Sequence, residues 1–248
     1  MSGGRFASSA VAEIVVVVPV LGRPQNAEPV ARSLGDAHRL VFVCSPEDGE
    51  QIAACEATWA DVIVAPFEAG HGDFARKVNL AYRMTDEPWI FQAADDVTFH
   101  AGWSQAALAC AEATGALVVG TQDGGNPEVK RGRHSTHTLI ARSYVDDPGA
   151  SWDGPGSVFS EAYGHQFCDT ELVALAKQRG VWAFADGARV THEHPFWVGR
   201  GLMDATYEKG LATSREDARL YRTRERLWKG VRSRHSQREP ATLPRPGS

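Results

Sequence analysis

Several features that define common protein classes are missing from this sequence. Its four cysteines include no CxxC pair and are too few for the disulfide framework of a small secreted domain. The longest apolar run, residues 14–21, is far shorter than the roughly 20 residues that cross a bilayer. Glu13 abuts that run and no small-residue cleavage site follows it, so no signal peptide is expected. We therefore expect reduced thiols and a cytoplasmic protein without a transmembrane segment.

Positive charge is scarce outside the last part of the chain. The formal net charge is −5, yet residues 214–248 hold ten Lys/Arg against four Asp/Glu, a net +6, which leaves −11 for the rest. Because phosphate backbones are held by cationic faces, an acidic body argues against broad nucleic-acid binding. For the Arg-rich end we favour a solvated helix followed by disorder, with contact to an anionic surface or partner as the alternative.

Strands and helices alternate over the first hundred residues. The β-branched runs predict strands at residues 14–19, 39–44, 61–65 and 89–93, with helices at 26–34, after Pro46, and at 74–84. This βαβαβαβ order predicts an α/β fold, a mostly parallel sheet with helices on both faces. Further along we expect helices at 102–113, 169–179 and 214–229, and strands at 117–120, 136–141, 181–185 and 189–192.

Two predicted strands end in residues of types that commonly bind metals. One apolar strand runs into Asp95 and Asp96, and a second β-branched segment ends in His192 and His194. Carboxylates with an imidazole suit Mn²⁺ or Mg²⁺ that also takes a phosphate, rather than a structural zinc. We assign Asp95, His192 and His194 as metal ligands and Asp96 as their support. The alternative is a helix-capping acid pair and two ordinary surface histidines.

Other polar residues are expected at the same edge of the sheet. Arg23 follows the first strand and Ser45 follows the second. In open α/β sheets, ligands bind outside the carboxyl ends of the strands. Arg23 could therefore stack on, or hydrogen-bond, a nucleotide base.

With these residues in place, the chain resembles the GT-A-fold glycosyltransferases, especially the large inverting family 2, over about residues 13–210. The resemblance rests on the order of five segments: Val18-Pro19 with Gly22-Arg23-Pro24, Lys77-Val78-Asn79, Ala94-Asp95-Asp96, Cys168-Asp169-Thr170-Glu171, and His192-x-His194-Pro195.

The resemblance implies a division of the chain and a set of ligands. A flexible leader (1–12) would precede a catalytic domain with a nucleotide-binding half (13–100) and an acceptor-binding half (101–210). A charged helix and disordered tail (211–248) would follow. The nucleotide side would use Arg23, Ser45, Lys77, Asn79 and Asp96. The donor would be a nucleotide-diphosphate sugar, foremost a UDP-sugar, and the acceptor a protein, a modified nucleic acid or a soluble glycan.

The resemblance also implies that Asp169 is the catalytic base. It would take the proton from an acceptor hydroxyl as that oxygen attacks the anomeric carbon opposite the leaving diphosphate, which inverts the centre. A carboxylate with a pKa near ~4 is already ionised at neutral pH. The metal, with Lys77, would stabilise charge on the departing phosphate. Asp169 could instead simply cap the helix that it begins.

The sequence departs from the family pattern at two places. The first acid of the usual D-x-D triplet is Ala93, and the acid that usually precedes the base is Cys168. In the family that first acid often contacts the ribose, so the departure leaves the identity of the nucleotide open.

Further residues fall where an acceptor pocket would form. These are Asp123, Thr136 and His137, with Trp152 in a Gly/Pro-rich loop as a candidate lid residue. Asp123 and Thr136 could equally well stabilise a turn, and His137 could equally well be a buried core histidine.

Three other functions compete with glycosyl transfer. A nucleotidyltransferase would use the same acids, but it usually has a Gly-rich basic loop after the first strand, and residues 21–25 hold one glycine and a proline. A non-catalytic nucleotide- or glycan-binding module would tolerate the loss of the acid at Ala93. A dinucleotide oxidoreductase is disfavoured because no GxGxxG follows the first strand.

Overall fold

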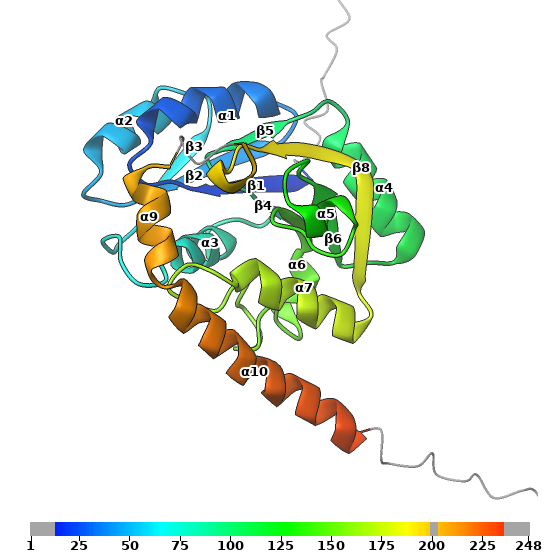
Figure 1. Cartoon of the computed structure of the whole chain (residues 1–248). Coiled ribbons are helices and arrows are strands. Elements are labelled where there is room, and N and C mark those ends of the chain that lie inside the picture. The colour runs from blue at the N-terminus through cyan, green and yellow to red at the C-terminus, as the bar shows by residue number, and fades with distance from the viewer. Residues whose placement is uncertain (1–12, 199–202, 236–248) are drawn as a thin grey trace, which may run out of the picture.

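The computed structural model describes residues 13–198 and 203–235. The expected leader (1–12) and the end of the expected disordered tail (236–248) lie outside the described residues. Within them, eight strands form one sheet in the order β3-β2-β1-β4-β7-β6-β8-β5 (Figure 1). The strands are β1 (Ile14–Pro19), β2 (Arg39–Cys44), β3 (Asp61–Val64), β4 (Trp89–Gln92), β5 (Val97–Phe99), β6 (Val118–Gln122), β7 (Thr138–Ala141) and β8 (Trp182–His192).

Helices connect these strands. They are η1 (Pro24–Asn26), α1 (Ala27–Leu34), α2 (Gly49–Glu56), α3 (Asp73–Arg83), α4 (Trp103–Thr114), α5 (Pro127–Lys130), α6 (Arg142–Asp146), α7 (Cys168–Arg179), α8 (Pro195–Val198), α9 (Ala205–Ala212) and α10 (Ser214–His235). The expected long helices are all confirmed to within a few residues, whereas α5, α6, α8 and α9 were not expected. No helix within the described residues is long and apolar enough to cross a bilayer.

The alternation of side chains along β1 explains why helices cover both faces of the sheet. Ile14, Val16 and Val18 are fully buried and belong to a core that includes residues of α1, α2 and α4. Val15 and Val17 point the other way, into a core that includes residues of α3, α6 and α7. Figure 1 shows α1 and α2 on one side of the sheet and α3 and α7 on the other. The predicted α/β architecture is confirmed.

The parallel and antiparallel parts of the sheet follow the chain order. β1 pairs in parallel with β2 and β4, and β2 with β3, as the βαβ pattern predicted. β7 is antiparallel to β4 and β6, and β5 is antiparallel to β8. The carboxyl ends of β1 and β4 therefore lie side by side, and the short strand β5 brings the end of β8 close to them.

One prediction about this half of the sheet is wrong. The two strands expected at residues 181–185 and 189–192 form the single strand β8. Its register with β6 shifts between Thr121, which pairs with Ala185, and Gln122, which pairs with Arg189. The exposed Asp186 lies in the skipped stretch, where its carboxylate accepts a hydrogen bond from the Gln122 side chain at 2.9 Å. A bulge of this kind bends a strand without ending it.

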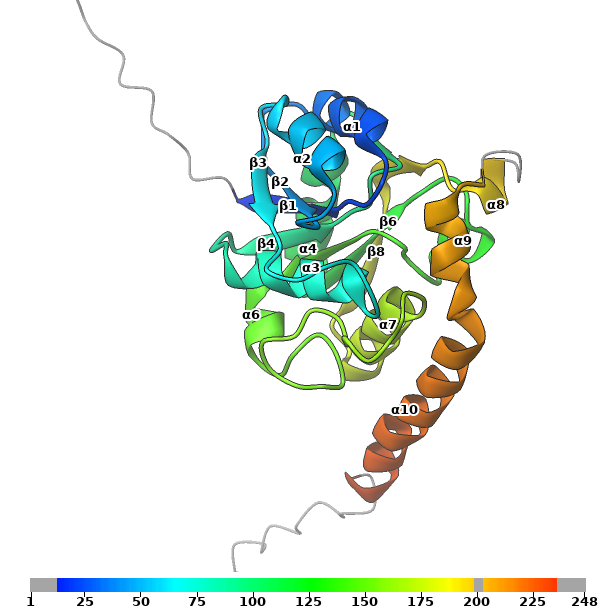
Figure 2. The ribbon, with the colours of Figure 1, turned by 90° about the vertical axis from the view of Figure 1, so that its left-hand side faces the viewer.

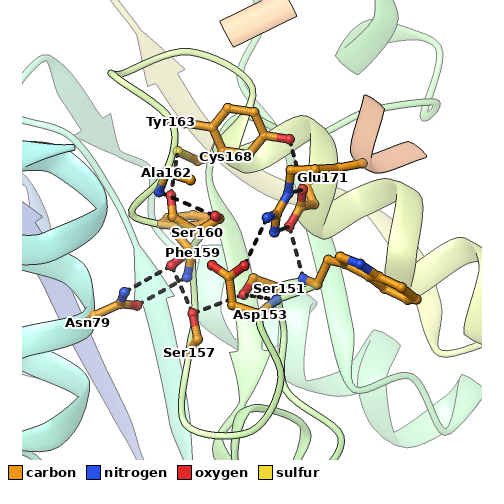
Figure 3. Close-up of polar contacts among 12 residues, drawn as sticks. Asn79, Ser151, Asp153, Ser157, Phe159, Ser160, Ala162, Tyr163, Cys168 and Glu171 are labelled. Atoms are coloured by element: carbon orange, nitrogen blue, oxygen red, sulfur yellow. Dashed lines mark hydrogen bonds and ion pairs between the residues drawn. The ribbon is translucent and has the colours of Figure 1, made fainter. Parts of the chain in front are cut away.

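A buried ion pair fixes α10 to α7. Glu171 is 1% exposed, and Arg224 donates to both of its carboxylate oxygens, at 2.7 and 2.8 Å. The Tyr163 hydroxyl donates to the same carboxylate at 2.8 Å, and Asp153 pairs with Arg224 at 2.9 Å. Figure 3 shows Tyr163, Asp153 and Glu171 converging from separate segments. The charged C-terminal helix is therefore built into the fold, and the boundary expected after residue 210 falls within α9.

Candidate active site

A cavity of about 500 Å³ opens at the carboxyl ends of β1 and β4, between α7 and α9. Its lining brings together six of the nine residues that the sequence assigned to the base, the metal or the nucleotide: Arg23, Asp95, Asp96, Asp169, His192 and His194. These residues come from segments up to 171 positions apart in the chain. The topology of the sheet, rather than any local motif, creates the site.

Asp95 is held by an arginine. Its Oδ1 accepts a hydrogen bond from Arg23 Nη1 at 3.0 Å, and both side chains are buried. Asp204, the N-cap of α9, accepts two further hydrogen bonds from Arg23, at 2.8 and 2.9 Å. Burial raises the pKa of Asp95 to about 7, although the charge of Arg23 opposes that shift. Asp95 is therefore engaged with Arg23 on the side of the cavity that the first strand forms.

Asp96, and not Asp95, lies beside the histidine. Its Oδ2 is 3.3 Å from His192 Nε2 and accepts a hydrogen bond from the Tyr207 hydroxyl at 2.5 Å. Burial disfavours the charge on both partners, but their interaction prevails: it lowers the pKa of Asp96 and raises the pKa of His192. The sequence had assigned Asp95 to the metal and Asp96 to its support, whereas the geometry pairs His192 with Asp96.

The donor atoms at this point fit a divalent cation. Within the described residues, Asp96 Oδ1 and His192 Nδ1 are both buried without a hydrogen-bond partner. Buried polar atoms normally have partners, so these two atoms, like both ring nitrogens of the adjacent His137, are open to a ligand or to water. An oxygen and an imidazole nitrogen are ligands that Mn²⁺ accepts. The described residues contain no group of three or more His, Cys, Asp or Glu side chains able to hold a metal, so further ligands would come from the substrate or water.

His194 lies close to this pair. Its ring centroid is 5.2 Å from that of His192 and 4.9 Å from that of Tyr207. Its Nδ1 accepts a hydrogen bond from the Phe196 amide at 3.2 Å, which leaves Nε2 for another partner. Burial and the neighbouring His192 lower its pKa to about 4, so the ring is neutral at physiological pH.

Asp169, the candidate base, has a histidine partner that the sequence did not reveal. His134 Nε2 lies 3.1 Å from Asp169 Oδ2, and the Thr170 amide donates to Oδ1 at 2.7 Å. These contacts lower the pKa of Asp169 although burial opposes the shift. His134 lies 35 positions away in a loop rich in Gly and Arg, where its only sequence signal was the histidine itself.

Three expected nucleotide-side residues lie outside the cavity lining. Lys77 is fully buried; its Nζ donates to the Val20 carbonyl at 2.8 Å and pairs with Asp73 at 2.9 Å. Asn79 donates to the Phe159 carbonyl at 2.9 Å and accepts from the Phe159 amide, as Figure 3 shows; it also accepts from the Val158 amide. Ser45 is fully buried, and its hydroxyl has no partner among the described residues. Lys77 therefore supports the cavity from behind through Val20 and Asp73, whereas Asn79 holds a loop that lies outside the lining.

The residues expected near an acceptor pocket have mixed placements. His137 lines the cavity with its ring centroid 4.6 Å from that of His192, and burial lowers its pKa to about 3. Asp123 accepts hydrogen bonds from two amides of its own turn and from the Thr136 hydroxyl, so it stabilises a turn. Trp152 packs against Trp228 of α10 with ring centroids 6.0 Å apart, and it lies outside the lining.

Helix α9 closes one side of the cavity, a feature that the sequence did not predict. Tyr207 stacks under the Arg23 guanidinium at 3.8 Å, in addition to its hydrogen bond with Asp96. The Thr206 hydroxyl donates to the Leu21 carbonyl at 3.2 Å, just after β1. α9 thus connects the end of the first strand with the acidic pair. Residues 199–202, which precede it, lie outside the described residues.

Comparisons with known proteins identify the fold. No protein-family model and no curated protein sequence matches this chain. Among solved structures, it is similar to glucosyl-3-phosphoglycerate synthase from Mycobacterium tuberculosis in complex with Mn²⁺, UDP-Glc and phosphoglyceric acid. The TM-score is 0.59 and the identity 15%, with 86% of this chain and 79% of that chain covered.

A second similar structure is mannosyltransferase PcManGT from Pyrobaculum calidifontis, in complex with GDP-Man and Mn²⁺. The TM-score is 0.58 and the identity 13%, with 72% of this chain covered. The match spans 56% of that mannosyltransferase, so this chain corresponds to little more than half of it. These likenesses show the fold. This chain has the GT-A fold, as its sequence motifs implied.

Proposed function

We propose that this protein is a metal-dependent glycosyltransferase that moves a sugar from a nucleotide-diphosphate donor to an acceptor hydroxyl with inversion. The observation that carries the proposal is the pair formed by Asp96 and His192. Its two orphaned atoms lie at the edge of a GT-A sheet, in the same cavity as the partly buried carboxylate of Asp169. The two similar structures are complexes with Mn²⁺ and GDP-Man or UDP-Glc, which supports the same class of donor.

Asp96 and His192 would hold the metal, and the diphosphate and water would supply its other ligands. His194, the third ligand expected from the sequence, is not grouped with these two side chains for metal binding. Bound there, Mn²⁺ or Mg²⁺ would neutralise charge on the leaving diphosphate. Asp95 would then serve the nucleotide through its contact with Arg23, and Tyr207 would orient Asp96. This exchanges the roles that the sequence gave the two acids.

Asp169 would act as the general base. Its low pKa keeps it ionised at neutral pH, so it can accept the proton of the acceptor hydroxyl as that oxygen attacks. His134 would fix the carboxylate's orientation through its hydrogen bond to Oδ2 and stabilise the ionised form. Attack from the face opposite the leaving group would invert the anomeric centre.

The nucleotide would lie along the carboxyl end of β1. Arg23 is placed to stack on, or hydrogen-bond, a base once it is released from Tyr207. Ser45, Lys77 and Asn79 remain candidates for that side, and Lys77 positions the Val20 carbonyl at the cavity. A UDP-sugar is the donor that we propose. We also propose a cytoplasmic setting, supported by four cysteines that are all free thiols.

A turnover assay tests the proposal. The protein would be incubated with Mn²⁺ and a panel of UDP- and GDP-sugars together with hydroxyl acceptors, and release of the nucleoside diphosphate would be measured. We expect release with one donor, dependence on Mn²⁺, and a loss of about 10³-fold in kcat for Asp169→Asn. NMR of the first-formed product would report the anomeric configuration.

Each failure of this assay has a distinct meaning. Donor binding without turnover, and no effect of Asp169→Asn, would support a non-catalytic binding module. Release of pyrophosphate from a nucleoside triphosphate and a sugar phosphate would identify a nucleotidyltransferase. Neither binding nor turnover with any donor would overturn the proposed function.

A further inference from the structure

Helix α10 carries a row of four arginines on one side. Arg215, Arg219, Arg222 and Arg226 are all exposed, and we call them the arginine row. Their spacing of four, three and four residues places them within roughly 60° of arc around the helix axis. At 1.5 Å per residue the row is roughly 16 Å long. No acidic residue falls within that arc.

The opposite side of α10 is fixed to the body. The buried residues Asp217, Arg224 and Trp228 lie roughly 180° away from the arginine row. The Asp217 carboxylate accepts three hydrogen bonds from the amides of residues 164–166, at 2.7 to 3.0 Å. Gln178 of α7 donates to the Trp228 carbonyl at 3.0 Å. The arginine row therefore points straight away from the body and is held there rigidly.

Both views show α10 at the outside of the molecule. In Figures 1 and 2 it runs along one side of the body beyond α9 and ends well clear of the sheet. A flat partner can therefore reach the outer side of α10 along its length.

The arginine row is not neutralised within the molecule. None of its four side chains forms an ion pair within the described part of the chain, whereas the neighbouring Lys229 pairs with Glu225 at 2.8 Å. Arg215 and Arg219, like Arg222 and Arg226, are like charges at i and i+4, an arrangement that destabilises a helix. These four positive charges nevertheless belong to a chain whose first 213 residues carry a formal net charge of −11. A polyanion would relieve this repulsion.

We propose that the arginine row docks the protein on an anionic phospholipid bilayer. A straight row on the crest of a helix meets a plane with all four side chains at once. Guanidinium groups bind phosphate oxygens in bidentate fashion, and a cytoplasmic leaflet presents those phosphates in a plane. Leu220, Tyr221 and Trp228 pack on the body, and the exposed Leu227 lies outside the arc of the arginine row, so docking is peripheral and electrostatic, without insertion of the helix.

A bilayer suits the arginine row better than a nucleic acid does. The arc of the row holds no aromatic or amide side chain that could stack on a base or read it. The contact therefore requires only a dense plane of phosphates.

Vesicle sedimentation tests the proposal on the full chain. One set of vesicles would be phosphatidylcholine alone, and another would include about 30 mol% phosphatidylglycerol. We expect binding only to the anionic vesicles, with release in roughly 0.5 M salt because screening shortens electrostatic range. The variant R215Q/R219Q/R222Q/R226Q should lower partitioning at least tenfold.

A matched variant separates the position of the charge from its amount. R32Q/R83Q/R131Q/R133Q removes four exposed arginines elsewhere and should bind anionic vesicles within twofold of the wild type. Equal losses in both variants, or no binding to anionic vesicles, would overturn the proposal. So would row-dependent binding of single- or double-stranded DNA or RNA without vesicle binding. Circular dichroism would verify that each variant is folded. The proposal is independent of the glycosyl-transfer activity.

Discussion

Two buried ion-paired clusters differ in how completely their atoms are bonded. Both Glu171 oxygens accept two hydrogen bonds each, from Arg224, the Tyr163 hydroxyl and the Trp152 amide. At the cavity, Asp96 uses only Oδ2, and its Oδ1 and the Nδ1 of His192 have no partner within the described residues.

This difference distinguishes the Glu171 cluster, which stabilises the fold, from the Asp96 cluster, which can bind a ligand. A fully satisfied polar network fixes one arrangement of its segments, and breaking it leaves a charge buried alone. A cluster whose buried polar atoms lack partners can bind a ligand that supplies the missing contacts. The comparison predicts that changes at Glu171 affect folding, whereas changes at Asp96 affect ligand binding.

The largest expected effect is the loss of stability in Glu171→Ala. Arg224 would stay buried with only the partly exposed Asp153 as a partner, and removing one member of a buried pair costs about 3–5 kcal/mol. Urea unfolding followed by circular dichroism measures the change. The exposed pair of Glu28 and Arg32 is a matched control, since Glu28→Ala should cost under about 0.5 kcal/mol. Equal losses of unfolding free energy in the two variants would show that Glu171 stabilises the fold no more than an exposed acid does.

Asp96→Asn should give the reverse pattern. The amide keeps an acceptor for Tyr207 but loses a charged metal ligand, so Mn²⁺-dependent affinity for a nucleoside diphosphate should fall about 100-fold, or about 2.7 kcal/mol. Unlike Arg224, His192 can lose its proton when its partner is uncharged, so the free energy of unfolding without ligand should change by about 1 kcal/mol or less. Calorimetric titration and urea unfolding supply the two numbers. A large loss of stability with unchanged affinity would reverse the comparison.

His134→Gln should have a smaller and pH-dependent effect. Asp169 would lose the partner that orients it, so kcat should fall about tenfold, or about 1.4 kcal/mol, with little change in KM. Burial lowers the pKa of His134, but Asp169 raises it overall above 6.5. The stabilisation is therefore fully present below pH 6.5 and is lost as pH rises through the raised value.

Unfolding of wild type and His134→Gln at several pH values checks that sign. The difference in unfolding free energy should be largest near pH 6 and shrink toward pH 9. A difference that grows with pH would show that His134 is not the charged partner of Asp169.

The smallest expected effect is that of Tyr207→Phe. The ring still stacks on Arg23, but Asp96 loses one hydrogen bond, which should lower the free energy of unfolding by about 1 kcal/mol. Mn²⁺-dependent nucleotide affinity should fall much less than in Asp96→Asn, because Tyr207 orients a metal ligand but is not one itself. A strong drop in affinity would make Tyr207 part of the binding site itself.

Elements of the fold that depend only on residues close together in the sequence were predictable. The valine run of β1 and the Gly180 that ends α7 are readable without tertiary information. The three-residue strand β5 was missed because Val97–Phe99 is too short for a periodic signal, and its partner β8 comes almost a hundred residues later. The sequence around Asp186 predicts a break between two strands for a similar reason, because the strand β6 that pairs with β8 on both sides of the bulge is distant in the sequence.

The members of the site were more predictable than their pairing. Strand ends identified Asp95, Asp96 and His192, because the ends of parallel strands meet at one edge. Which acid faces His192 depends on the direction of each side chain after β4, and the sequence does not encode that locally. Lys77 could not be placed either: its burial depends on Asp73 and on the Val20 carbonyl, a contact 57 positions away.

The central claim is that Asp96 and His192 form a metal site for a nucleoside diphosphate. The most direct measurement is calorimetric titration of UDP and GDP, with and without Mn²⁺, into wild type, Asp96→Asn and Asp95→Asn. The account predicts binding that requires Mn²⁺, is lost in Asp96→Asn and keeps its metal dependence in Asp95→Asn. Binding that is independent of Mn²⁺, or lost only in Asp95→Asn, would contradict it.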